Sequence, residues 1–136
     1  MRLWHYKLIP YLPKSQLLAQ KRECDLILKD RWNGNRTNHI LINYIYEYSD
    51  YSFNVYYSKL YAEFKKRGFA FRDKFGIVNY YYAEDSDLTC FDRHHNNEYL
   101  TICYYNLKEK YLREQGDFTK EIWEKLEEFY KKEIHK

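Results

Sequence analysis

Four stretches of this chain place apolar side chains at the spacing of an α-helix, and this pattern constrains the fold more than any other feature. The stretches are 14–29, 53–67, 94–113 and 118–134. Residues 39–48 fit two periods, because alternate positions are apolar as in a strand while Ile40 and Tyr44 also share a helical face. We interpret them as helical. The predicted fold class is therefore all-α, with three to four main helices.

Residues that start or stop helices flank these stretches. Pro13 stands at the beginning of the first one, where its missing N–H costs nothing. The basic residues 65–67 complement the helix dipole at the end of the second, and Gly68 can supply a left-handed cap there. Asp117 is expected to cap the last helix.

The length of 136 residues suits a single domain that buries roughly two-thirds of the surface of its unfolded chain. We expect a compact domain over 1–136. It would consist of an extended N-terminal arm at 1–13, a helical core at 14–113 and a C-terminal amphipathic helix at 117–134. Residues 70–93 show no helical period and are expected to form a long loop.

Prolines and lysines interrupt every apolar run near the start of the chain, so we expect no signal peptide. No stretch approaches the length of a membrane span, and we expect a cytoplasmic protein with no membrane contact. The cysteines are odd in number and lack paired spacing, which argues against a disulfide framework or a zinc ribbon. We expect buried thiols at Cys24, Cys90 and Cys103.

The net charge of +3 is unevenly distributed along the chain. Residues 1–68 hold 12 Lys and Arg against 6 Asp and Glu, whereas residues 69–136 hold 11 against 14, which gives +6 and −3. A basic half suits a polyanionic partner, although solubility alone explains a moderate charge.

The chain start is the strongest candidate for chemistry. An α-amino group has a pKa of about 8 and a lysine side chain about 10.4, so a chain terminus is a ready nucleophile at neutral pH. The large Arg2 should prevent removal of the initiator methionine, which leaves the free amine on Met1. The first helix then carries Arg22 beside Glu23, and Glu23 is the candidate acid/base partner of the amine.

Two amides share a stripe of the first helix with this glutamate. Gln16, Gln20 and Glu23 lie beside the apolar face, where a proton can be held or given. The alternative is an ordinary solvated flank of a helix, and only the proximity of the chain start favours the first interpretation.

These residues resemble the pyrimidine-dimer DNA glycosylase family, the endonuclease V type that excises ultraviolet photoproducts. The opening Met1, Arg2, Leu3 is similar to the family's amine-bearing first residue followed by an arginine and an aliphatic residue. The similar positions on the helices are Leu17, Ala19, Arg22, Glu23, Ala62, Glu63, 66–69, Leu107, Glu109 and Lys110. The segments 1–5 and 8–10, with the histidines 94–95, also look like a little-characterised bacterial branch of that family.

The resemblance implies a helical DNA repair glycosylase and abasic-site lyase acting on damaged double-stranded DNA, with neither a metal nor a dissociable cofactor. Its terminal amine, here on Met1, would attack the deoxyribose C1′ to give an imine, while Glu23 manages protons. Arg2 and Arg22 would hold phosphates around the lesion. The implied secondary DNA contacts are Gln16, Lys66, Arg67 and Lys110.

Two departures from the family's pattern bear on the substrate. Met1 itself stands where the family exposes a small hydroxyl-bearing residue by removing the methionine. Asn106 stands where better-known members have an arginine. A lesion other than a pyrimidine dimer is therefore left open.

Other interpretations of the same residues exist. Trp4 or Trp32 could be a wedge that fills an opened DNA stack, or a residue of the core or of a hinge. The histidines 94–95 with Cys90 or Cys103 could ligate a metal, although no second pair completes a site. A non-catalytic nucleic-acid-binding module is the main rival to the enzyme, and a pure interaction protein is the third.

Overall fold

A pair of crossed long helices and a helical hairpin form the two halves of the molecule. The elements in chain order are η1 (Tyr6–Tyr11), α1 (Lys14–Trp32), η2 (Asn43–Glu47), α2 (Asp50–Arg67), α3 (Tyr80–Glu84), α4 (Asn97–Leu112) and α5 (Lys120–Ile134), where η marks a 3-10 helix. The computed structural model describes residues 1–136. Four of these helices are long and no strand is present, so the predicted all-α fold is confirmed.

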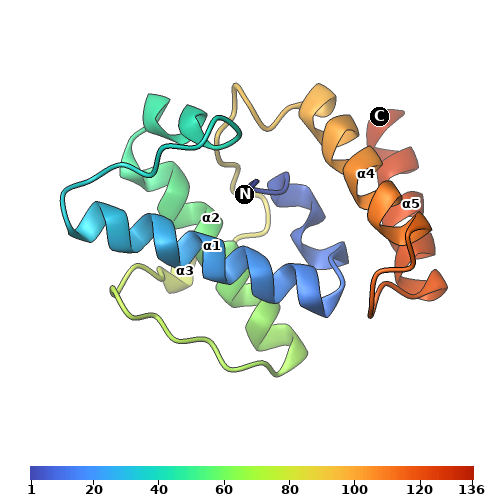
Figure 1. The fold of residues 1–136 in the computed structure, drawn as a ribbon, viewed down its shortest axis with the longest axis horizontal. Helices are drawn as coiled ribbons and strands as arrows, with labels where there is room; N and C mark the ends of the chain where they lie inside the picture. The colour runs from blue at the N-terminus through green and yellow to red at the C-terminus, as the bar shows by residue number, and fades with distance from the viewer.

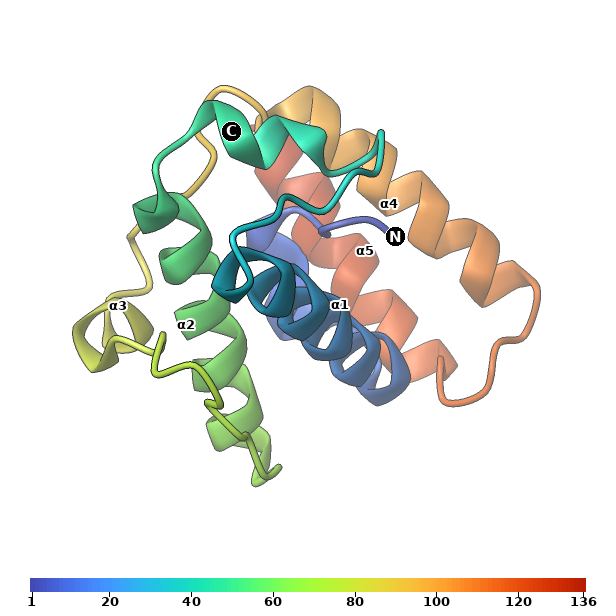
Figure 2. The same cartoon turned by 60° about the vertical axis from the view of Figure 1, so that its left-hand side comes forward.

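The N-terminal segment lies between the two halves. Figure 1 shows α1 crossing α2 on one side and the antiparallel pair α4 and α5 on the other, with the chain start in the middle. In the turned view of Figure 2 the chain start again lies between α1 and α4. η1 packs against both α2 and α5, and it therefore joins the two halves.

The arm predicted at 1–13 is not extended throughout. Tyr6–Tyr11 forms η1, and the His5 side chain caps it by accepting a hydrogen bond from the N–H of Lys7. Leu8 and Ile9 are buried in this turn. Pro10 lies inside η1, because the fixed φ of a proline also suits a helical turn and a short 3-10 helix loses only one hydrogen bond to it.

The helix ends follow the sequence signals at Pro13, which precedes α1 directly, and at Gly68, and they depart from them at Asp117 and at the start of α4. Gly68 ends α2 with φ of 75°, the left-handed conformation that favours glycine. Thr119, rather than Asp117, caps α5. Asp117 lies two residues earlier and instead accepts hydrogen bonds from the N–H and hydroxyl of Ser15, at 2.8 and 2.6 Å. α4 starts at Asn97, three residues later than predicted.

Two less regular stretches contain short helices. Within 39–48 the structure forms η2, which is shorter than the helix interpreted there. The stretch 70–93 is mostly loop but includes the five-residue helix α3. Asn79 caps α3 by accepting hydrogen bonds from two backbone N–H groups. So short a helix leaves no periodic signal in the sequence.

One hydrophobic core runs through both halves and includes the N-terminal segment. Leu3, Leu8 and Leu12 are fully or almost fully buried in it. All three cysteines are buried and unpaired, as expected. No helix is both long enough and apolar enough to cross a lipid bilayer.

Candidate active site at the chain start

A pocket of about 270 Å³ opens beside the first residue. It is lined by Met1, Arg2, Trp4, Gln16, Ala19, Gln20, Glu23, Leu41, Asn106 and Lys110. The lining residues come from the chain start, from α1, from the segment before η2 and from α4. The pocket therefore brings together five of the eight candidate site residues, which are Met1, Arg2, Gln16, Glu23 and Lys110.

Gln20 links the chain start to Glu23. Its amide oxygen accepts a hydrogen bond from the N–H of Trp4 at 2.7 Å. Its amide nitrogen donates to the carbonyl of Arg2 at 3.0 Å and to Glu23 Oε2 at 3.1 Å. Gln20 is buried, and its bond to Trp4 is shielded from water, while the two donated bonds are partly buried. One side chain thus fixes the first residues and the carboxylate relative to each other.

Three successive carbonyls of the chain start are held by three different helices. The carbonyl of Arg2 accepts a hydrogen bond from Gln20 of α1. The carbonyl of Leu3 accepts from the hydroxyl of Tyr99 of α4 at 2.5 Å. The carbonyl of Trp4 accepts from the hydroxyl of Tyr56 of α2 at 2.7 Å. The path of the backbone that carries the terminal amine is therefore set by α1, α2 and α4 together.

Met1 and Glu23 lie in the same pocket without forming a direct ion pair. Glu23 Oε2 is held by Gln20, and Oε1 has no protein partner. The pocket volume of about 270 Å³ therefore borders both the first residue and this carboxylate. Asn106 also borders this volume, at the position where the resemblance had suggested an arginine.

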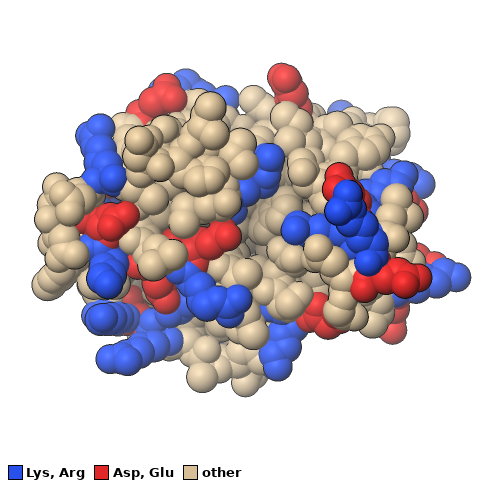
Figure 3. Space-filling model, in the orientation of Figure 1, with Lys and Arg blue, Asp and Glu red and all other residues tan.

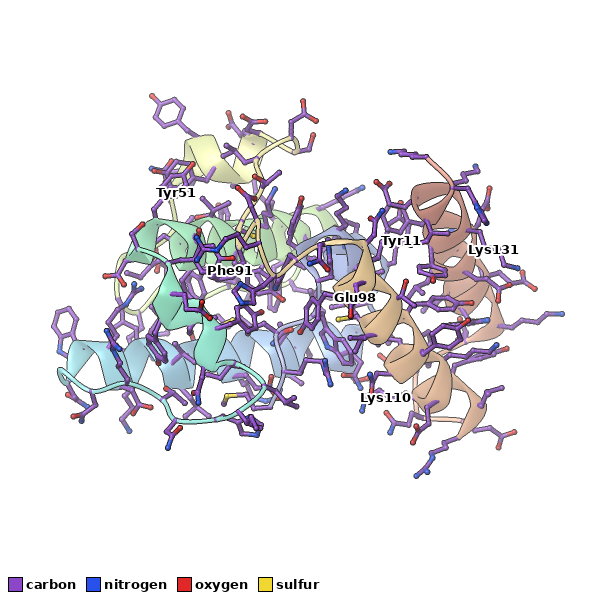
Figure 4. The ribbon with its side chains drawn as sticks, turned by 90° about the horizontal axis from the view of Figure 1, so that it is seen from above. Tyr11, Tyr51, Phe91, Glu98, Lys110 and Lys131 are labelled. Carbon is purple, nitrogen blue, oxygen red and sulfur yellow. The ribbon has the colours of Figure 1, made fainter.

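Two cationic side chains line the pocket, Arg2 from the chain start and Lys110 from α4. The guanidinium of Arg2 lies 5.9 Å from the centre of the Tyr99 ring, and Lys110 reaches the pocket from α4. Figure 4 shows Lys110 near the C-terminal end of α4. Figure 3 shows a hollow near the middle of this face with lysine and arginine atoms on its rim and some carboxylate atoms beside them.

The other three candidate residues do not line this pocket. Arg22 is exposed on the neighbouring flank of α1. Lys66 lies at the end of α2 and borders a different pocket, formed with η1, α3 and α5. Arg67 forms an ion pair with Glu63 at 2.7 Å and donates to the carbonyl of Pro10 at 3.2 Å, so its charge is already neutralised.

The histidines that had suggested a metal have other partners. Both ring nitrogens of His95 are used, since Nδ1 accepts from the N–H of Tyr6 at 3.1 Å and Nε2 lies 2.7 Å from the hydroxyl of Tyr44. His94 contacts Tyr48 and Glu47. No group of three or more His, Cys, Asp or Glu side chains is placed to hold a metal ion.

Burial keeps the inner histidines neutral. It lowers the pKa of His5 to about 4, with Lys7 acting in the same direction. It also lowers the pKa of His95 well below the ordinary value of histidine. These rings pack behind the chain start as part of the core, with ring centres 5.1 Å apart.

Sequence reasoning placed Gln20 beside Glu23 but did not identify it as a site residue, and it did not identify Tyr99, Tyr56 or Leu41. The spacing of three between Gln20 and Glu23 was the available signal, because such residues are neighbours on a helix surface. The two tyrosines gave no comparable signal among seventeen.

This arrangement defines an all-helical protein in which the first residue and a carboxylate line the same partly basic pocket. A family model for pyrimidine dimer DNA glycosylase matches residues 1–76, which is more than half of the chain. The chain belongs to this family, and it is accordingly a DNA repair glycosylase with DNA as its substrate.

The matched region includes the chain start, α1 and α2, and therefore Met1 and Glu23. Lys110 and Asn106 complete the pocket from outside it. No curated protein and no solved structure matches the chain.

Proposed function

We propose that this protein releases damaged bases through an imine formed by the amine of Met1, and then cleaves the strand as an abasic-site lyase. The observation that carries the proposal is the shared pocket of Met1 and Glu23, in which Gln20 is bonded both to the chain start and to the carboxylate. A reactive amine needs such fixed geometry, because placing the reacting groups removes much of the entropic barrier.

The first half of the reaction breaks the glycosidic bond. The nitrogen lone pair attacks C1′, and the damaged base leaves with the electrons of the bond and takes up a proton. The amine loses its protons as the sugar ring opens, and an imine to C1′ results. We assign the protons of these steps to Glu23 Oε1, the oxygen that is free of protein partners.

The second half cleaves the strand. The imine acidifies the proton on C2′, and its removal expels the 3′ phosphate with the electrons of its C–O bond. Water then hydrolyses the imine, which regenerates the amine and releases the unsaturated sugar. The steps are a substitution at C1′, a β-elimination that forms the double bond between C2′ and C3′, a hydrolysis and the accompanying proton transfers, so no electrons are gained or lost overall.

Basic side chains supply the affinity for the damaged duplex. We assign Arg2 and Lys110 to phosphates next to the extruded nucleotide, with Gln16 beside them at the pocket and Arg22 along the flank of α1. Lys66 and Arg67 would contact DNA only where the duplex extends to the end of α2. Their contribution should be the smaller one, since Arg67 is already paired with Glu63.

Borohydride trapping on a duplex with one abasic site tests the proposal. The protein is used with its first residue unmodified, and its intact mass shows whether Met1 is present. We expect a covalent adduct that maps to the N-terminal peptide, that disappears when the α-amine is blocked, and that forms poorly in the isosteric Glu23→Gln variant.

An adduct on a lysine side chain would overturn the assignment of Met1. Salt-sensitive binding without any adduct would instead support the non-catalytic module. A duplex carrying a pyrimidine dimer, compared with an abasic duplex, shows whether base excision precedes the lyase step.

A further inference from the structure

Two apolar side chains stand unpacked at the rim of the candidate active site. Ile40 is 87% exposed and Leu41 is 40% exposed, and Leu41 lines the pocket that contains Met1 and Glu23. The segment that carries them, between α1 and η2, runs past the chain start on the same face of the molecule (Figures 1 and 2). The next residue, Ile42, is fully buried and anchors the segment in the core.

Hydrogen bonds hold this segment in a defined turn. The N–H of His39 donates to the side chain of Asn43 at 2.9 Å, and the N–H groups of Ile42 and Asn43 both donate to the carbonyl of His39 at 2.9 Å. The N–H of Leu41 donates to the imidazole of His39 at 3.2 Å. The N–H of Thr37 donates to the hydroxyl of Tyr46 at 2.7 Å. The exposed pair is thus presented by a bonded turn.

We propose that Ile40 and Leu41 form a wedge that enters the base stack of the duplex when the damaged nucleotide moves into the pocket. The proposal rests on the proposed function, because it takes the pocket as the site that receives the nucleotide. Removing a nucleotide from a duplex leaves an apolar gap between stacked bases, and aliphatic side chains fill such gaps in proteins that kink DNA.

The partner of these two side chains is DNA, because Leu41 lines the pocket that receives the substrate and because a basic residue lies in the same segment. Leu41 belongs to the same pocket as Arg2 and Lys110. Arg36, in the same segment, is exposed, and its guanidinium lies 5.0 Å from the centre of the Tyr46 ring. A held guanidinium beside two apolar side chains suits a phosphate next to an opened base step.

The tryptophans suggested by the sequence do not serve this role. Trp4 is 7% exposed, and its backbone is bonded to Gln20 and Tyr56. Trp32 is exposed, but it lies at the last residue of α1, where it packs against Phe75, and it does not line the pocket. The wedge is therefore aliphatic.

The test compares trapping of the same abasic strand with and without its complement, because only the duplex holds the site in a base-paired stack. The double variant Ile40→Ala/Leu41→Ala is trapped with borohydride on an abasic duplex and on the same abasic strand alone. We expect the rate on the duplex to fall about tenfold, because the wedge no longer offsets unstacking, and the rate on the single strand to change by less than about twofold. Leu112→Ala, which removes another exposed apolar side chain outside the pocket, is the matched control.

Two further variants and a second readout complete the test. Ile40→Leu/Leu41→Met keeps the apolar volume and should retain the duplex rate. The fluorescence of 2-aminopurine placed beside the abasic site reports unstacking on binding, and it should rise with the wild-type protein and not with the alanine variant. Equal losses on both substrates, or an unchanged fluorescence rise in the alanine variant, would overturn the wedge.

The two proposals fail in different ways. Absence of trapping by the wild-type protein would overturn the proposed chemistry, while the fluorescence measurement would still decide about the wedge. Normal trapping with an unchanged ratio of duplex to single-strand rates would overturn the wedge alone.

Discussion

At the scale of single residues, the position of the amine depends on one buried amide. Gln20 has its oxygen on the backbone of Trp4 and its nitrogen on both Arg2 and Glu23. Because a buried polar group without a partner is costly, each bond restrains the others. The amide thus acts as a positioning group for the candidate nucleophile and its acid/base partner, without contact to substrate being required.

Replacing this amide by a carboxylate should misplace the chain start. Gln20→Glu keeps an acceptor for the N–H of Trp4, but it loses both donated bonds and places a second carboxylate against Glu23. We expect the trapping rate to fall about tenfold or more, since a misplacement of the reacting groups by about 1 Å can cost about a hundredfold in rate. Single-turnover trapping measures the rate, and circular dichroism confirms the fold.

Asn97→Asp is the matched control, because it adds the same charge at an exposed position outside the pocket. It should trap at the wild-type rate. A wild-type rate in Gln20→Glu would contradict the positioning role.

The buried histidines should make the fold sensitive to acid. Burial lowers the pKa of His5 to about 4 in the folded protein, while an unfolded histidine has a value of about 6.5. Below pH 6.5 the unfolded chain therefore binds the additional proton, and the stability present at pH 7 is lost as the pH falls toward 4. A full shift of this size corresponds to about 3 kcal/mol.

Urea unfolding at pH 7 and pH 5 measures this loss. His5→Asn should flatten the dependence on pH, since asparagine can still accept from the N–H of Lys7 but does not titrate in this range. His135→Asn, at the exposed end of α5, should leave the dependence unchanged. A pH dependence in His5→Asn as steep as that of the wild type would rule out His5 as its source.

At the scale of elements, long helices were predictable and short ones were not. α1 and α2 span many turns, so their apolar faces repeat often enough to be recognised, and Gly68 marks the end of α2 through its backbone conformation. η1 and α3 are too short for a periodic signal, and tertiary packing determines them.

The candidate site likewise has a part that the sequence predicts and a part that only the packing of helices determines. Local spacing identified Glu23 and the neighbouring amides on α1, because residues on one helix face have a fixed relation. Lys66 and Lys110 are both near helix ends, and spacing within a helix does not say which of these ends meets the chain start. In the structure it is the end of α4, with Lys110, that lies at the pocket beside the chain start.

Binding to DNA should distinguish lysines on different elements. Lys110→Ala removes a cation beside the pocket and should lower affinity for an abasic duplex while reducing the salt slope of log K by about 1. Lys131→Ala is the control, since Lys131 lies on the outer side of α5 in Figure 4 and already pairs with Glu127. Fluorescence anisotropy at several salt concentrations measures both, and equal slopes for the two variants would contradict the assignment of Lys110.

At the scale of the whole molecule, the two halves meet on the N-terminal segment. η1 packs on α2 and on α5, and the residues before it are bonded to α1, α2 and α4. The sequence indicated that the chain start and Glu23 belong together through family resemblance. It gave no sign that the start is also the central packing element, because that depends on contacts between residues far apart in the chain.

The anchoring of the three carbonyls at 2–4 has a consequence for the life of the chain. The partner of Leu3 on α4 follows it by almost a hundred residues. The chain start therefore reaches its final geometry only after α4 has packed, and a partly folded molecule would hold its first residues less firmly. Assembly of the pocket is in this way coupled to completion of the fold.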